Sequence, residues 1–347
     1  MRPVSGNGKS NGEGRKPLAS ISLDLDNLWS YMKIHGDLGW TSFPSYLEPF
    51  SEIAIDRFRA HRLTVTVFIV GQDAALAKNA NAMRAIAGAD HEIANHSFSH
   101  EPWFHTYPLE QVEREIAEAE AAIERATAQK PRGFRGPGFS LSPQTLSVLV
   151  QRGYLYDAST FPTFLGPLAR AYYFWNSRGL SKDEREKRKE LFGSAREGLR
   201  DLRPYLWTIA ATDRATNGTR QSRDAHQLLE IPVTTMPFLR VPIHMSYIIY
   251  LALYSKRLAR AYLRAAFGLI RKRGLELSFL LHPLDFLGKD KVQELAFFPG
   301  MQASTDFKLR LFDEVMGELK ESFQPVTMQE HARVLLDGGR LKQASLS

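Results

Sequence analysis

The sequence ISLDLDN at residues 21–27 begins as an alternating apolar segment and ends in two carboxylates. Apolar and β-branched residues in such a run predict a buried strand. Asp24 and Asp26 are two residues apart, so their side chains lie on the same face of an extended chain. Two neighbouring carboxylates repel each other unless a cation neutralises them, which indicates a metal site. A helix cap, or a surface turn leading into Asn27, is the alternative.

Similar apolar runs recur along the chain and alternate with helical patterns. We expect strands at residues 63–70, 91–94, 154–156, 230–233 and 275–281, and helices at residues 46–61, 72–87, 109–128, 143–152 and 247–273. This alternation predicts an α/β fold with a parallel sheet or barrel. In such folds the chemistry lies on loops at the carboxyl ends of the strands. Asp24, His96, Asp157 and His282 each end or follow a predicted strand, so we expect them at one site.

Composition limits the kind of site and partner. The 347 residues suffice for one large barrel or two ordinary domains, and 44% of them are hydrophobic, enough for a sizeable core. Cysteine is absent, so any metal must be held by His and carboxylates. The net charge of +7 favours an anionic partner. No nucleic-acid-binding module accompanies this charge, so nucleic acid is not expected.

The chain is interpreted as one domain with a tail and an insertion. Residues 1–16, rich in Gly, Asn, Ser and Lys, lack the apolar run of a secretory signal and are interpreted as a disordered basic tail. Residues 17–340 form the predicted domain. An insertion at about 164–226 breaks the alternation of strands and helices. Its Trp175 and Trp207 could stack on sugar rings or fill a core.

Three further segments carry candidate chemistry. His96 and His100, in HSFSH, are four residues apart, which suits a divalent metal; surface or capping histidines are the alternative. Arg135 lies in GFRGPGF, where Gly and Pro fix an irregular backbone, so its guanidinium could pair with a carboxylate or be that of an ordinary loop arginine. His282 leaves a buried strand just before a proline, where a histidine can be structural or catalytic.

In this order the segments resemble the motifs of the polysaccharide deacetylase family, also called the NodB-homology domain or carbohydrate esterase family 4. SLDLDN at 22–27 is similar to T-F-D-D-G, with an inserted leucine that makes it a D-x-D variant. HSFSH at 96–100 matches H-[ST]-x-x-H, RGPG at 135–138 resembles R-x-P-x-G, and LLH at 280–282 resembles L-x-H. The resemblance covers about residues 20–285, without 164–226. It implies a distorted (β/α) barrel of about seven strands with a helical and aromatic insertion.

The resemblance also implies a role for each matching residue. In that family the first acidic residue of motif one is the general base, and the second binds a metal with the two histidines. An arginine orients the base and a histidine is the acid. For the single divalent ion we expect zinc, with cobalt, nickel, manganese or iron as alternatives. The implied catalytic residues are Asp24, Arg135 and His282, and the implied metal ligands are Asp26, His96 and His100.

Further residues are candidates for substrate contacts. Gly138 stands where the family often has Tyr, and its backbone N–H could donate to an oxyanion. Asp157, in YDAST, could orient His282 or cap the next segment. Trp103 and Trp207 complete the candidate substrate-binding residues.

The implied function is removal of an N-acetyl or N-formyl group from an amino sugar by metal-activated water. The D-x-D form is similar to a branch that acts on peptidoglycan, lipid-linked or exported glycans. One alternative is an amidase that acts on a small non-sugar amide. Another is a non-catalytic glycan- or lipid-binding protein on the same barrel, although binding alone would need neither an acid nor a base.

Residues 243–273 combine an apolar aromatic patch with a basic amphipathic helix. The apolar run is shorter than the about 20 residues that cross a bilayer. An interfacial helix on an anionic membrane is one interpretation, and a barrel helix packed on the sheet is the other. Because the sequence shows no signal peptide and no transmembrane span, we expect a cytoplasmic protein, peripheral at the inner face of the membrane if the helix is interfacial. At 100° per residue the basic side holds Lys256, Arg257, Arg260, Arg264 and Arg271, and the apolar side holds Leu258, Tyr262, Ala265 and Leu269.

Overall fold

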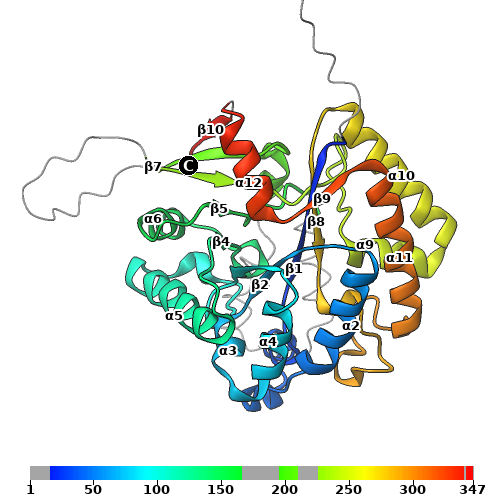
Figure 1. Cartoon of the computed structure of the whole chain (residues 1–347), viewed down its shortest axis with the longest axis horizontal. Helices are drawn as coiled ribbons and strands as arrows, with labels where there is room; N and C mark the ends of the chain where they lie inside the picture. Colours follow the sequence, from blue (N-terminus) through cyan, green and yellow to red (C-terminus); the bar gives the residue numbers. More distant parts are fainter. Residues whose placement is uncertain (1–15, 166–194, 210–225, 340, 347) are drawn as a thin grey trace, which may run out of the picture.

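A computed structural model describes residues 16–165, 195–209, 226–339 and 341–346. Its strands form one sheet surrounded by helices (Figure 1). The strands are β1 (Leu18–Asp24), β2 (Thr66–Ile69), β3 (Glu92–Asn95), β4 (Gly133–Phe134), β5 (Tyr156–Asp157), β6 (Tyr205–Ile209), β7 (His226–Glu230), β8 (Leu277–Leu281), β9 (Gln324–Val326) and β10 (Lys342–Ala344). The α-helices are α1 (Leu28–His35), α2 (Leu47–Ala60), α3 (Gly71–Ala75), α4 (Ala80–Ala87), α5 (Leu109–Thr127), α6 (Pro143–Gln151), α9 (Met245–Tyr254), α10 (Lys256–Lys272), α11 (Thr305–Ser322) and α12 (Met328–Asp337). Short 3₁₀ turns are η1 (Leu38–Ser42), η2 (Ala77–Asn79), η3 (Phe104–Thr106), η4 (Pro137–Phe139), η6 (Ala195–Leu199), η7 (Pro283–Asp285) and η8 (Gln293–Leu295).

The sheet has the strand order β10-β6-β7-β5-β4-β3-β2-β1-β8, with β9 also paired to β1. Neighbouring strands are parallel except β6 and β7. The predicted α/β fold is confirmed, with ten strands where about seven were expected. In the described part of the chain the two end strands, β10 and β8, are not paired with each other, so closure into a barrel stays a prediction.

Burial explains why these segments take up their positions. All seven residues of β1 are buried, as expected for a central strand covered on both faces. In α5 the buried Val112, Ile116, Ala119 and Ile123 recur at helical spacing and form one apolar stripe. This stripe packs α5 inward, while most of its charged residues are exposed; the buried Glu120 is an exception.

The register of the parallel strands brings their carboxyl ends to one edge. Asp24 of β1 pairs with Phe68 of β2, and Phe134 of β4 pairs with Asp157 of β5. On the other side of β1, Leu23 pairs with Leu281, the last residue of β8. Residues that follow these strands therefore emerge near one another, as the sequence predicts.

The predicted helix at 247–273 is instead two helices, α9 and α10. Ser255 between them is extended, and its Oγ accepts a hydrogen bond from Leu258 N (3.2 Å), which caps α10. The predicted apolar side was also wrong, because Leu258 is 54% exposed and Ala265 is exposed. The face of α10 that packs inward carries Ala259, Leu263, Ala266, Phe267 and Ile270.

Part of the basic side of α10 is neutralised by α11, which lies beside it (Figure 1). Arg260 pairs with Glu314 (2.7 Å) and Arg264 pairs with Glu318 (2.5 Å). Among the helices that the structure describes, none combines the length and apolar character needed to cross a membrane.

The insertion predicted at 164–226 contributes a strand to the sheet. Its β6 pairs with β7 and with β10 near the end of the chain. Residues 1–15 of the predicted tail, and Trp175 in the insertion, lie outside the described residues.

Candidate active site

The end of β1 places two carboxylates at the carboxyl edge of the sheet. Asp24 is the last residue of the strand, and Leu25 N still donates to a carbonyl of β2 (3.0 Å). Asn27 then caps α1. Asp26 therefore lies in the short connection between strand and helix. Asp24 is 4% exposed and Asp26 is 9% exposed, so both carboxylates need a compensating partner.

The loop after β3 carries the two candidate histidines. Glu115 of α5 anchors this loop, because its Oε2 accepts hydrogen bonds from Phe98 N (3.0 Å) and Ser99 N (2.8 Å). His100 has a φ of 52°, in the left-handed region that non-glycine residues seldom adopt. This tight turn directs the imidazole of His100 back toward that of His96, with ring centroids 5.1 Å apart.

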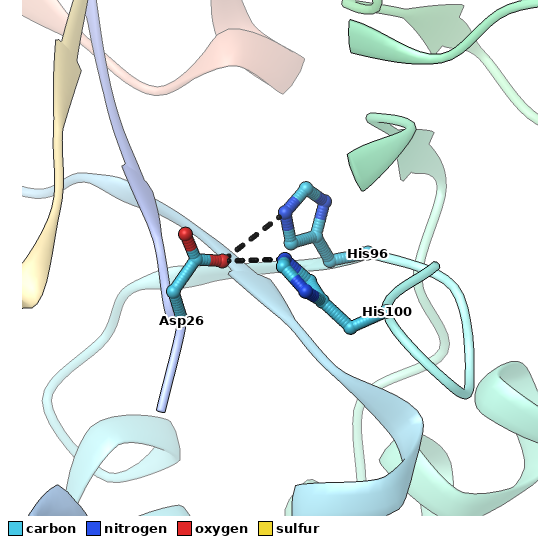
Figure 2. Close-up of side chains that lie close together, drawn as sticks. All are labelled: Asp26, His96 and His100. Carbon is cyan, nitrogen blue, oxygen red and sulfur yellow. Dashed lines mark ion pairs between the residues drawn. The ribbon is translucent and has the colours of Figure 1, made fainter. Parts of the chain in front are cut away.

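Asp26, His96 and His100 point toward one another (Figure 2). Asp26 Oδ1 lies 3.4 Å from His96 Nε2 and 2.8 Å from His100 Nε2. One ligand atom from each residue lies within 4.8 Å of the other two. Atoms about 2.1 Å from a tetrahedral metal ion are about 3.4 Å apart, so the spacing fits a divalent metal after small adjustments.

The hydrogen bonds of the triad also fit a metal. In the described structure, buried Asp26 Oδ1 and His100 Nε2 have no hydrogen-bond partner, despite their proximity. His96 Nδ1 lies 2.7 Å from the carbonyl oxygen of Arg135, which would fix the tautomer that leaves Nε2 as a ligand. Burial acts to raise the pKa of Asp26, but the adjacent imidazoles outweigh it and hold the pKa well below its ordinary value. Asp26 is thus an anion at neutral pH, as a ligand must be.

Arg135 holds Asp24 in place. Its Nη1 donates to Asp24 Oδ1 (2.5 Å) and to Ser22 Oγ (3.0 Å), and its Nε donates to Ala158 O (3.0 Å). The guanidinium also lies over the ring of Phe68, 4.3 Å from its centroid. Arg135 is fully buried, so the two charges compensate each other away from water. The predicted pairing of Arg135 with a carboxylate is therefore present in the structure.

His282 follows β8, and its backbone N donates to Asp285 Oδ2 (2.7 Å). The side chain is 21% exposed, and its Nδ1 lies 3.9 Å from Asp285 Oδ2 and 3.4 Å from Ser246 Oγ. Asp285 is 1% exposed, so its carboxyl group is a fixed neighbour of the imidazole. Sequence reasoning missed Asp285, although the pattern HPLD contains this pair at a spacing of three residues.

Tyr31 of α1 connects the triad with the His282 region. Its pKa is raised well above the ordinary value by burial, by the charge of Asp26, by Tyr46 and by the charge of Asp285. A single buried side chain therefore experiences both carboxylates, which places the triad and the His282 loop at the same end of the sheet.

Asp157 was expected either to orient His282 or to cap the next segment, and its hydrogen bond is with that next segment. Its Oδ1 accepts a hydrogen bond from Ser159 Oγ (2.6 Å), and Ser159 Oγ accepts one from Gly136 N (2.8 Å). The charge of Asp157 also acts on the buried Glu230, whose pKa is raised by burial and by that charge. These contacts make Asp157 part of the support under the Arg135 loop, and Asp285 is the carboxyl group beside His282.

The three remaining candidates for substrate contact lie in different surroundings. Gly138 has a φ of 59° within η4, and Trp103 is half-buried. Trp207 is fully buried, and its Nε1 donates to Glu230 Oε2 (2.9 Å). The prediction that Trp207 contacts substrate is corrected, since a ring enclosed in the core cannot stack on a sugar.

Sequence reasoning also missed Asp73 of α3, which lies beneath the triad. Its Oδ1 accepts hydrogen bonds from Asn27 Nδ2 (2.7 Å), Trp29 Nε1 (2.9 Å) and Asn79 Nδ2 (3.1 Å). Burial raises the pKa of Asp73 to about 6, although these donors and the charge of His100 lower it. No motif marks Asp73, because its hydrogen-bond donors come from two segments, the start of α1 and η2.

A family model and a curated relative each match part of this chain. Residues 37–156 match the family model described as polysaccharide deacetylase. The match contains His96, His100 and Arg135, and it begins after Asp26 and ends before His282. A peptidoglycan deacetylase-like protein, FGM2, of Gibberella zeae is 32% identical over 90 residues, which are 26% of this chain and 25% of that protein. The match thus spans about a quarter of the curated relative.

One solved structure shares the fold of this chain along its whole length. A Mycobacterium smegmatis protein described as a "putative polysaccharide deacetylase" has a TM-score of 0.58 and 16% identity, covering 100% of this chain and 97% of that chain. At this identity the likeness shows the fold alone. A family 4 acetyl xylan esterase of Clostridium thermocellum, in complex with a cobalt ion, has a TM-score of 0.32 and 20% identity, covering 46% of this chain and 69% of that chain.

Proposed function

Because residues 37–156 match the family model described as polysaccharide deacetylase, we propose that the chain is a metal-dependent hydrolase of N-acylated amino sugars. It would remove an N-acetyl or N-formyl group from a cell-envelope, exported or lipid-linked glycan. The observation that carries this proposal is the convergence of Asp26, His96 and His100 beside Asp24, which Arg135 holds. Two imidazoles and a carboxylate suit zinc, our preferred metal.

Each chemical need of amide hydrolysis has a candidate in the chain. The metal, when bound, supplies Lewis acidity that activates water and polarises the acyl oxygen. Asp24 accepts the proton of the attacking water, and Arg135 keeps its carboxylate aimed. His282 donates a proton to the leaving nitrogen, and Asp285 holds the loop from which it does so.

The test combines metal analysis with measurement of acetate and formate released from a panel of N-acylated glycans. We expect about one bound divalent ion per chain, and Asp24→Asn to retain it while losing about 10²- to 10⁴-fold in activity. His282→Ala should behave likewise, whereas His96→Ala should lose the metal. Asp56→Asn, an exposed carboxylate, is the matched control. Full activity of Asp24→Asn and His282→Ala would contradict the mechanism, and metal binding without release of any acid would favour a binding protein.

We further propose that the chain is cytoplasmic and contacts an anionic membrane through α9 and α10. No acidic residue occurs between residues 245 and 273. Exposed Tyr254 (73%) and Leu258 (54%) accompany the basic side chain of Arg257. Ser246, at the start of α9, contacts His282, so a lipid-linked sugar in that membrane would be near the site.

Vesicle flotation tests the membrane contact. Since glutamates already pair with Arg260 and Arg264, the informative variants are Arg257→Glu and Leu258→Ser. We expect the wild-type chain to float with anionic vesicles and both variants to remain in solution. Leu336→Ser, an exposed leucine on α12, is the control. A wild-type chain that stays in solution would refute the contact.

A further inference from the structure

A cavity of about 290 Å³ lies away from the candidate active site. It is bounded by the segment at 198–203, the turn at 237–240 and the chain at 273–275, which joins α10 to β8. Leu275 in its wall precedes His282 by seven residues along β8, or about 20 Å in extended chain. Its volume is near the lower end of the about 300–1,000 Å³ typical of small-molecule sites.

The charge of the cavity is strongly positive. Three arginines line it, Arg203, Arg240 and Arg273, against one acid, Asp201. Asp201 is already engaged, since it accepts hydrogen bonds from Lys342 Nζ (2.9 Å) and from Arg203 N (3.0 Å). Within the described residues, no carboxylate forms an ion pair with any of the three guanidinium groups.

Arg240 has the least compensation of the three. It is half-buried, and its Nη1 is buried without a hydrogen-bond partner among the described residues. Burial lowers the pKa of Arg240, and the charge of Asp201 offsets this only in part. An uncompensated guanidinium is costly to bury, so an anion entering the cavity would relieve a cost already present in the fold.

The surrounding chain holds these groups in position. Arg203 Nη2 donates to the carbonyl oxygen of Arg273 (2.9 Å), and the guanidinium of Arg273 lies 4.8 Å from the ring centroid of Phe238. Phe238 and Arg240 have φ values of 68° and 55°, so the turn that presents them is in the left-handed region. The arginine cluster is therefore built by the tertiary structure and is more than a run of basic residues.

We propose that this cavity binds the phosphate group of a phosphate ester. Guanidinium groups bind phosphate bidentately, and several on one side of a cavity suit its multiple oxygens. Leu199 is 74% exposed, and Phe238 and Leu239 are each 66% exposed, so apolar surface beside the charges can receive the organic part of the ester. The ester could be a phospholipid headgroup or a soluble sugar phosphate. The proposal is independent of the deacetylase assignment, because none of its residues belongs to the candidate active site.

Calorimetric titration with glycerol 3-phosphate tests the site, with Arg240→Gln as the main variant. We expect Arg240→Gln to weaken binding about 10- to 100-fold, as for loss of one charge-assisted contact. Without phosphate, the variant should unfold at the same or a higher temperature, because an uncompensated charge has been removed. Arg333→Gln, an exposed arginine on α12, has the same charge change and should bind normally.

A second arm distinguishes the two sources of phosphate. If the wild type binds phosphatidylglycerol vesicles and Arg240→Gln does not, the ligand is a lipid headgroup. If Arg240→Gln weakens the binding of glycerol 3-phosphate but not of the vesicles, the ligand is a soluble ester. No binding of either probe, or equal weakening by Arg333→Gln, would overturn the proposal. Should Arg240→Gln fail to fold, the exposed Arg273→Gln tests the site by the same criteria.

Discussion

The pairing of Arg135 with Asp24 can be tested by removing the two charges separately and together. Both side chains are enclosed, so Arg135→Met leaves an uncompensated carboxylate and Asp24→Asn an uncompensated guanidinium. Breaking a buried ion pair from one side costs about 3–5 kcal/mol. The double variant buries no unpaired charge. It should lose only about 2 kcal/mol, for the hydrogen bonds of Arg135 to Ala158 O and Ser22 Oγ at about 1 kcal/mol each.

Urea unfolding of the wild type, both single variants and the double variant measures these free energies of unfolding. The expected signature is a double variant that is more stable than either single variant. Arg57→Met is the matched control, because Arg57 pairs with Asp313 at 3.1 Å on the surface, with side chains 38% and 36% exposed. Such a pair contributes about 0–1 kcal/mol. Losses that simply add in the double variant would refute the view that Arg135 and Asp24 form one compensated unit.

Three further predictions concern single residues. Burial lowers the pKa of His91 from 6.5 to about 4, so its contribution to stability is present above pH 6.5 and lost as the pH falls toward 4. His91→Gln should therefore flatten the dependence of the unfolding free energy on pH between these two values. An unchanged slope would contradict this. Asp285→Asn should lower kcat with little change in KM, because it perturbs the support of His282; a pure KM effect would speak against that role. Trp207→Phe should lower the melting temperature and leave KM unchanged, because this ring lies in the core. Trp103→Ala should raise KM with little loss of stability. The opposite pattern would contradict the assignment of Trp207 to the core and of Trp103 to the substrate site.

Much of the fold was predictable because hydrophobic burial leaves a regular pattern. The strand containing Asp24 and the long helix α5 were both expected close to their observed bounds. The largely exposed β10 was not expected, since Lys342–Ala344 has no apolar alternation. The inward face of α10 was also misplaced. Leucine and tyrosine occur on two sides of that helix, and the sequence alone does not show which side meets the core.

The candidate site was predictable to the extent that its residues lie in short motifs. The short sequence patterns around His96, His100 and Arg135 predicted these residues as candidates, and the structure places them together with Asp24 and Asp26. The supporting groups were not predicted, because their contacts join distant segments. Glu115 of α5 accepts hydrogen bonds from the loop that carries the histidines. The pKa of the buried Tyr31 is raised by the charges of Asp26 and Asp285, which are far apart in the chain. Such partners become visible only when the fold is known.

Arg135 contacts two functional groups through different parts of the same residue. Its carbonyl oxygen lies 2.7 Å from His96 Nδ1, and its guanidinium donates a hydrogen bond to Asp24. The segment that contains Arg135 is closely packed, because a side chain at Gly136 would place its Cβ 2.0 Å from Ser140 O. A displacement of this segment would therefore disturb a candidate metal ligand and the proposed base simultaneously. In the proposed mechanism, a substitution in this segment should therefore change the affinity for the ion and the rate of proton abstraction together.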